Sequence, residues 1–131
     1  GLNALRAAKK VSGKTKLIGV TILTSLDNKS LKEIGFNKDV KKVVFHQAKL
    51  ATRAKLDAIV CSPHEIKIVK KVFKKEIITP GIRLLGDNKG DQKRIMTPKQ
   101  AFQNGATALV MGRSLTGNIK KNIQKLIKEL N

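Results

Sequence analysis

The residues of this sequence best suited to chemistry lie in one polar loop and one glycine-arginine pair. The loop follows an expected strand at residues 76–78 and the turn Pro80-Gly81, and it ends at Thr97-Pro98. Among the polar side chains that it carries are Arg83, Asp87, Asp91, Gln92, Lys93 and Arg94. An α/β protein usually places its binding groups in a long polar loop between a strand end and a helix start. This loop is therefore a candidate for binding.

Gly112-Arg113 follows a later apolar run and has the chemistry of a phosphate site. A glycine lets backbone amides approach a ligand closely, and a guanidinium can make two parallel hydrogen bonds to phosphate oxygens. Arg83 and Gln92 can reach the same ligand from the loop. We predict a phosphate site here, although the spacing alone leaves open that Arg83 and Arg113 are ordinary surface arginines.

Four apolar runs alternate with helical patterns and predict the scaffold of this site. The expected strands are residues 16–23, 57–61, 76–78 and 108–111. The expected helices are residues 2–11, 30–34, a helix capped by Asn37, a helix after 62–65, residues 98–104 and an amphipathic helix from 119 to 130. Such strands run parallel through right-handed crossovers, so their carboxyl ends share one edge of the sheet. The near-continuous apolar run at 16–23 predicts a strand buried on both faces.

Two helix starts have the spacing of a capping box, in which two side chains three positions apart bond each other's backbone. They are Ser62-Pro63-His64-Glu65 and Thr97-Pro98-Lys99-Gln100. The second also has proline at the first helical position, and Gly105 is placed to end that helix.

The composition fits one domain spanning residues 1–131. The chain is 40% hydrophobic, and no run reaches the ~18 apolar residues of a membrane span. The single Cys61 excludes an internal disulfide and favours a reducing, cytoplasmic setting, with this thiol in the core. Neither His46 nor His64 has partners at the spacing of a metal site, and no convincing general acid or base is visible. We expect no metal, no cofactor and no catalytic residue.

The net charge of +19 raises the possibility of nucleic-acid binding. The excess is mainly lysine spread along nearly every helix, and the sequence has neither tyrosine nor tryptophan for base stacking. We favour a solvated lysine surface and do not expect nucleic acid as a partner.

Five segments form a joint pattern over essentially the whole chain. They are Val20-Thr21-Ile22-Leu23-Thr24-Ser25, Ile59-Val60-Cys61-Ser62-Pro63, Ile78-Thr79-Pro80-Gly81-Ile82-Arg83, Asp91-Gln92-Lys93-Arg94-Ile95-Met96-Thr97-Pro98 and Val110-Met111-Gly112-Arg113-Ser114-Leu115-Thr116. In this order they resemble the orotidine 5'-phosphate decarboxylase family. The third, fourth and fifth segments are far more specific together than any one alone.

The resemblance implies a (β/α)₈ barrel that works as a homodimer without cofactor or metal. Such an enzyme converts orotidine 5'-phosphate to UMP and carbon dioxide in pyrimidine biosynthesis. By match to the family's motifs, Gln92 and Arg113 hold the phosphate, and Gly112 contributes its backbone. Arg83 belongs to the same phosphate end, and Thr24 matches a hydroxyl residue that contacts the pyrimidine.

The family's catalytic cluster, Asp-x-Lys-x-x-Asp, has no match in this sequence. We therefore expect a parallel α/β half-barrel, the C-terminal half with four of eight strands, inactive alone because the catalytic N-terminal half is absent. Four strands leave the sheet edges and the apolar inner layer open, so we expect self-association or a complementary N-terminal-half chain. The alternative is a non-catalytic binding or assembly protein that reuses the half-barrel.

Overall fold

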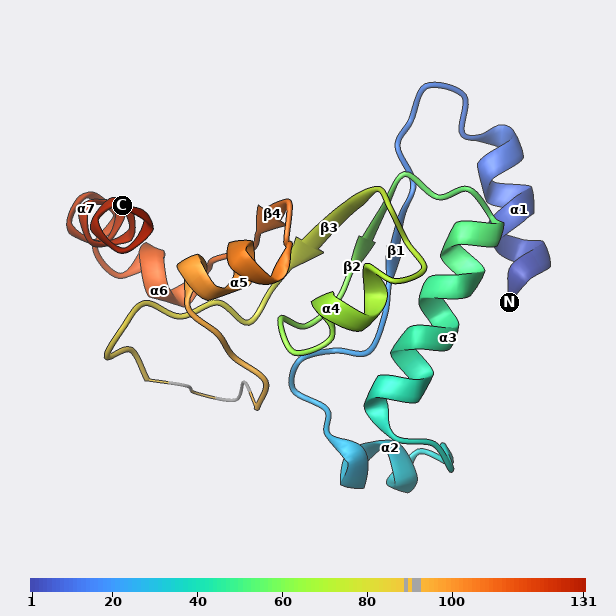
Figure 1. The fold of residues 1–131 in the computed structure, drawn as a ribbon, viewed down its shortest axis with the longest axis horizontal. Helices are drawn as coiled ribbons and strands as arrows, with labels where there is room; N and C mark the ends of the chain where they lie inside the picture. The colour runs from blue at the N-terminus through green and yellow to red at the C-terminus, as the bar shows by residue number, and fades with distance from the viewer. Residues whose placement is uncertain (89, 91–92) are drawn as a thin grey trace.

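The computed structural model describes residues 1–88, 90 and 93–131, and its centre is one parallel sheet (Figure 1). The strands are β1 (Ile18–Val20), β2 (Ala58–Val60), β3 (Glu76–Thr79) and β4 (Ala108–Leu109). They pair in the order β1-β2-β3-β4, all parallel. The alternation of strand and helix therefore predicted the parallel topology correctly. β1, β2 and β4 are shorter than expected, and β3 is one residue longer.

Helices precede, connect and follow the strands, and a helical layer lies along one face of the sheet. They are α1 (Leu2–Val11), α2 (Asn28–Glu33), α3 (Val40–Arg53), α4 (Ile66–Val69), α5 (Pro98–Asn104), α6 (Arg113–Thr116) and α7 (Ile119–Leu130). Neighbours contact in the order α1, α3, α4, α5 and α7, which places the two chain ends far apart in Figure 1. No helix within the described ranges is both long enough and apolar enough to cross a membrane.

The core lies between this helical layer and one face of the sheet. Ile59 and Ile77 are paired across β2 and β3, and both are buried. They pack in one cluster with apolar side chains of α3 and α4, including Val44, Ile66 and Val69. Alternate residues of a strand point to opposite faces, so this row fixes which side of each strand meets the helices.

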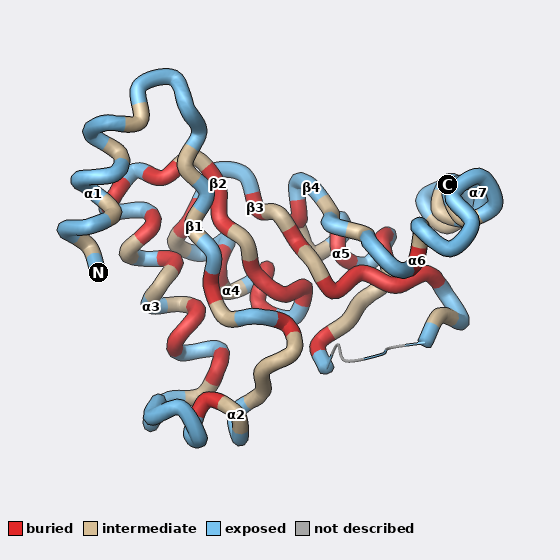
Figure 2. Tube along the Cα trace, turned by 180° about the vertical axis from the view of Figure 1, so that it is seen from behind, coloured by how far each residue is buried: buried red, intermediate tan, exposed pale blue. Residues whose placement is uncertain are grey.

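The other face of the sheet is largely uncovered, and the expectation that residues 16–23 are buried on both faces is wrong. The register aligns Val20, Val60, Ile78 and Ala108 on this face. Val20 is 63% exposed, and Figure 2 shows β1 from this side with exposed residues at both its ends. The physical reason is that β1 is an edge strand with no described element packed over its second face.

The last helix has an apolar stripe with little to pack against. Four of its five apolar residues, Ile119, Ile123, Ile127 and Leu130, are exposed, between 39% and 60%, and the fifth, Leu126, is half-buried. The amphipathic pattern predicted the helix correctly, and α7 contacts α5 and α6, but none of its residues is buried.

Two of the three predicted helix starts differ from the structure. Asp39, not Asn37, caps α3, because its side chain accepts a hydrogen bond from the Lys42 amide. The capping box at 62–65 is wrong: α4 has no side-chain cap, and the Glu65 carboxylate binds Arg94 instead. The box of Thr97 with Gln100 is confirmed, as is the end of α5 at Gly105.

Asp57 ties three elements together at the amino end of the strands. It accepts hydrogen bonds from Lys9 Nζ of α1 (2.5 Å) and from the Leu17 amide (2.8 Å), and Lys75 Nζ lies 3.6 Å away. The hydrogen bond from Lys9, followed by that from Leu17, lowers the pKa of Asp57 to about 2. Since the folded pKa is depressed, this stabilisation is complete above the unfolded pKa near 4 and is lost as the pH falls toward 2.

We predict that Asp57→Asn lowers the melting temperature at neutral pH and that its difference from wild type closes between about pH 4 and pH 2. Thermal unfolding followed by circular dichroism across this range measures the difference. Glu76→Gln is the control, because its pair with Lys16 is exposed and contributes little. A difference that stays constant down to pH 2 would contradict this role of Asp57.

Candidate functional site

The candidate site lies at the carboxyl edge of the sheet, where parallel pairing gathers the ends of all four strands. Thr24 comes after β1, Gly81 directly after Thr79-Pro80 at the end of β3, and Gly112 after β4. The segments that the sequence singled out therefore share one edge, as expected.

Arg83 and Arg113 come together in a cavity of about 310 Å³ at this edge. Its lining residues are Arg83, Asp87, Asn88, Gly90, Arg113, Ser114 and Asn122. Arg113 begins α6, and its Nη1 lies 3.0 Å from the place that a Cβ on Gly90 would occupy. Two guanidinium groups in one small cavity suit a doubly charged phosphate.

Backbone carbonyls fix the orientation of Arg83. Its Nε donates to the Asn88 carbonyl at 3.2 Å, and its Nη1 donates to the Ile82 carbonyl at 2.9 Å. Ser114 Oγ donates to the same Ile82 carbonyl at 3.5 Å, so the loop after β3 and the start of α6 meet there. Arg83 is only 8% exposed, which separates it from an ordinary surface arginine.

Gly112 and Gln92 are the other two residues predicted to bind the phosphate. Gly112 has a φ of −99°, and a Cβ there would meet no described atom within 4 Å, so neither conformation nor crowding within the described chain requires glycine. The open space beside it is available to a ligand. Gln92 and Asp91 lie outside the described residues.

Thr24 is buried at a different place along the edge. It is not among the described residues that line the arginine cavity. Its Cγ2 would lie 3.2 Å from a Cβ on Gly81, whose φ is +77°. The same Cβ would lie 2.8 Å from the Arg94 carbonyl oxygen, so only glycine allows these three segments to approach.

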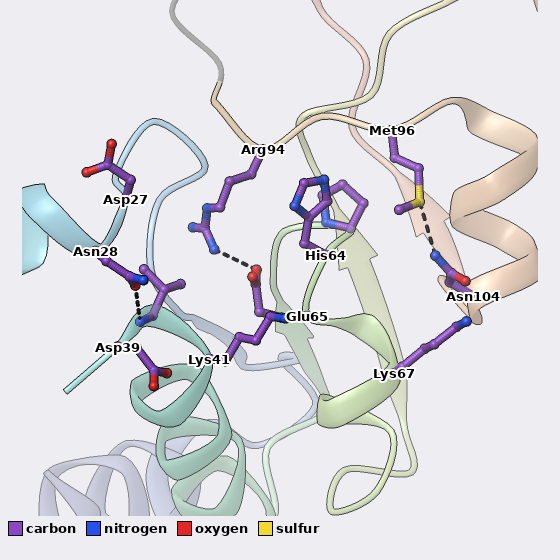
Figure 3. Close-up of a pocket in the computed structure, with 12 residues that line it drawn as sticks. Asp27, Asn28, Asp39, Lys41, His64, Glu65, Lys67, Arg94, Met96 and Asn104 are labelled. Carbon is purple, nitrogen blue, oxygen red and sulfur yellow. Dashed lines mark hydrogen bonds and ion pairs between the residues drawn. The ribbon is translucent and has the colours of Figure 1, made fainter.

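The sequence analysis missed a buried ion pair between Arg94 and Glu65 (Figure 3). Arg94 Nη1 lies 2.6 Å from Glu65 Oε2, and the two side chains are 9% and 2% exposed. Arg94 Nη2 also donates to the carbonyls of Ile22 (3.1 Å) and Leu23 (2.7 Å). The only signal in the sequence was Glu65, a glutamate directly before an apolar helical run. The sequence analysis assigned this glutamate to a capping box instead of an ion pair.

A larger cavity, of about 620 Å³, lies beside this pair among the starts of α2, α3 and α4. Its described lining includes neither Arg83 nor Arg113, and its charges are mixed: Asp27, Asp39, Lys41, His64, Glu65, Lys67 and Arg94. The carboxylates are engaged, since hydrogen bonds from Lys93 and then Ser30 hold the pKa of Asp27 well below its usual range. We place the candidate site at the smaller cavity, where like-charged guanidinium groups converge.

Cys61 is a core residue, as predicted. It is buried in β2's continuation, and burial raises the pKa of its thiol to about 12. Such a thiol stays protonated and unreactive at neutral pH. Within the described part of the chain, no three His, Cys, Asp or Glu side chains lie close enough to hold a metal ion.

Comparison with known proteins shows the family of this chain. The sequence model of the family described as "Orotidine 5'-phosphate decarboxylase / HUMPS family" matches residues 1–124. The chain belongs to this family. As a member of the orotidine 5'-phosphate decarboxylase family, it shares a parallel α/β fold with proteins of the (β/α)₈ barrel type.

Similar members of the orotidine 5'-phosphate decarboxylase family come from bacteria. The enzyme of Coxiella burnetii (strain RSA 493 / Nine Mile phase I) is 48% identical over 117 residues, which cover 88% of this chain and 49% of that protein. That of Prochlorococcus marinus (strain MIT 9215) is 44% identical over 134 residues, 93% of this chain and 55% of that protein. The chain thus spans about half the length of the curated relatives it matches.

A solved structure of the family matches the fold of this chain. The crystal structure of orotidine 5'-phosphate decarboxylase from Lactobacillus acidophilus matches with a TM-score of 0.77 and 28% identity. The match covers 100% of this chain and 59% of the other. Together with the four parallel strands, it confirms the predicted α/β half-barrel.

We predict that Gly81→Ala destabilises this family member more than Gly86→Ala does. Both glycines have positive φ, +77° and +84°, a conformation that costs other residues about 1–2 kcal/mol. A Cβ at Gly86 would meet no described atom within 4 Å, whereas at Gly81 it would strike the Arg94 carbonyl. Overpacking should add roughly 1–3 kcal/mol to the loss at Gly81 in urea unfolding. Equal losses for the two variants would show that the segments do not approach this closely.

Proposed function

We propose that this chain binds orotidine 5'-phosphate or UMP and holds the phosphate between Arg83 and Arg113. The observation that carries the proposal is that both guanidinium groups line one cavity of about 310 Å³ at the carboxyl edge of the sheet. Each planar guanidinium can donate two charge-assisted hydrogen bonds to phosphate oxygens. Family membership supports this ligand class.

The remaining contacts follow from the motif match and the position of each residue. The space beside Gly112 leaves room for a ligand next to Arg113. Gln92 joins the phosphate end on the motif match alone. We assign Thr24 to the pyrimidine end on the motif match; its burial beside Gly81, apart from the arginine cavity, supports this assignment.

We further propose that the chain alone does not decarboxylate its ligand. Loss of carbon dioxide leaves a carbanion that must be protonated, so the reaction needs a positioned acid as well as binding groups. The family's Asp-x-Lys-x-x-Asp cluster has no match here. The Glu65 carboxylate is engaged by Arg94, which also donates to the Leu23 carbonyl.

We predict that Arg113→Ala weakens UMP binding by roughly 10- to 100-fold, because hydrogen bonds to charged groups contribute about 1.5–3 kcal/mol. Isothermal titration calorimetry at physiological salt measures the affinity. Arg6→Ala is the matched control: it removes the same charge from the exposed face of α1, at the other end of the chain. Equal affinities for Arg113→Ala and wild type would contradict the phosphate site.

A separate assay tests whether the isolated chain is inactive as a decarboxylase. Orotidine 5'-phosphate absorbance, followed at high protein concentration, should show no turnover above the uncatalysed rate. Turnover that Arg113→Ala abolishes would mean that this chain contains an active-site acid, and would overturn the proposal of inactivity.

We also propose that another polypeptide covers the open parts of the half-barrel, either a second copy or a complementary N-terminal-half chain. Two apolar surfaces support this. The Val20 row of the sheet is open, and the stripe of α7 is exposed. A groove of about 370 Å³ adjoins the Val20 row along β1, with Ile18, Leu50 and Leu56 in its lining. Unpaired strand edges and exposed apolar stripes favour association.

We predict that the purified chain forms a discrete oligomer larger than 14.4 kDa, and that Ile123→Lys with Ile127→Lys weakens it. Both changes place charge in the α7 stripe. Gln124→Lys, on the same helix but outside the stripe, is the control. Light scattering after size-exclusion chromatography measures the mass, with and without the N-terminal half of the Coxiella burnetii enzyme. A chain that stays monomeric and does not bind this N-terminal half would contradict the proposal.

A further inference from the structure

Arg94 links the two ends of the candidate site, and we propose that it forms with Glu65 a positioning pair. In this proposal, the pair holds the carboxyl end of β1, and with it Thr24, against the loop that presents Arg83. Arg94 Nη2 donates to the carbonyl of Leu23, the residue before Thr24, at 2.7 Å. Its Nη1 is anchored on Glu65 at 2.6 Å. The proposal concerns arrangement: neither side chain is assigned a contact with the ligand.

The segment that carries Arg94 is also joined to the Arg83 side of the site. The Arg83 amide donates to the Met96 carbonyl at 3.1 Å, and the Met96 amide donates to the Gly81 carbonyl at 3.2 Å. One short segment, residues 94–96, therefore bonds the end of β1 through Arg94 and the loop after β3 through Met96.

Other contacts hold the same segment from outside. Lys93 Nζ lies 2.8 Å from Asp27 of the loop before α2, and His64 Nε2 lies within hydrogen-bond distance, 3.0 Å, of the Ile95 carbonyl. These contacts are exposed, whereas the Arg94–Glu65 pair is buried. Exposed contacts are screened and weak, so the buried pair is the one that sets the geometry.

The chemistry of the pair favours a role in arrangement over one in stability alone. Burying two charges costs about as much as their attraction returns, and well-packed apolar residues often stabilise a protein equally well. A guanidinium, however, offers several donors in a fixed plane. Arg94 uses this plane to reach a carboxylate and two carbonyls from different segments, which an apolar pair of the same volume cannot do.

The test replaces the pair with apolar residues of similar volume, Arg94→Met with Glu65→Met. Removing both charges avoids leaving one buried without its partner. The control is Lys9→Met with Asp57→Met, which removes an ion pair at the opposite end of the strands. Folding is checked by far-UV circular dichroism. Should the double variant not fold, Arg94→Lys replaces it, because lysine keeps the charge but loses the planar set of donors.

Two readouts are compared. Hydrogen exchange is followed at the Leu26 amide, which donates to the same Leu23 carbonyl as Arg94, and at the Met96 amide. UMP affinity is measured by calorimetry, and this second readout rests on the proposed function. In the Met variant, we expect the arrangement that binds UMP to fall to roughly a tenth of the population. Hydrogen exchange at both amides should then be about tenfold faster, and the affinity for UMP about tenfold lower. The control pair should change neither.

The outcomes separate this inference from the proposed function. If wild type binds no UMP, the proposed function fails, and the exchange readout alone decides the role of the pair. Unchanged exchange at Leu26 and Met96 in the folded Met variant overturns the positioning role. Unchanged UMP affinity overturns it as well, when wild type binds. Equal effects in the Lys9–Asp57 control also overturn it, because the pair would then act only through global stability.

Discussion

Parallel pairing of the four strands determines both what this chain can bind and what it leaves uncovered. Each crossover between two strands returns the chain to the amino end of the sheet, so every strand delivers its carboxyl end to one edge. That edge gathers Thr24, Gly81 and Arg113 from distant parts of the sequence. The same pairing stops at β1 and β4, where backbone groups of the outer strands have no described strand beside them. Both the candidate site and the unpaired sides of β1 and β4 therefore follow from the parallel pairing of the strands.

The buried charges at this edge must be understood together. A charge removed from water needs a partner of opposite sign and good hydrogen bonds. Arg94 meets this need with Glu65 and two backbone carbonyls. Arg83, also buried, donates to two carbonyls, and Arg113 lines the same cavity. Carbonyl dipoles orient a guanidinium without cancelling its charge. Two guanidinium groups that line one cavity favour an anionic ligand there.

The sequence predicted the parallel sheet, the helices other than α6 and the shared edge, because alternating apolar runs and helical stripes reflect local physics. It predicted the box at Thr97 but not the cap of α3, since Asn37 and Asp39 are both acceptable caps and only the path of the chain selects Asp39. Glu65 shows that local spacing in the sequence does not predict a partner that is distant along the chain. Its spacing from Ser62 fits a local cap, yet Arg94, 29 residues away, captures its carboxylate. Burial of β1 was predicted wrongly because an apolar run records what a strand can bury, not whether a partner layer is present.

The net charge of +19 acts differently on the ligand and on assembly. Exposed lysines attract any phosphate, but screening limits their reach to about 8 Å at physiological salt, so they add little selectivity. Discrimination must come from the two arginines of the cavity, of which Arg83 is buried and so less screened by salt. Association of two identical copies brings like charges together, and the exposed apolar stripe of α7 has to outweigh that repulsion. A partner with an acidic balance would face no such cost. Charge therefore favours an acidic partner over a second copy at low salt, and the preference weakens as salt rises.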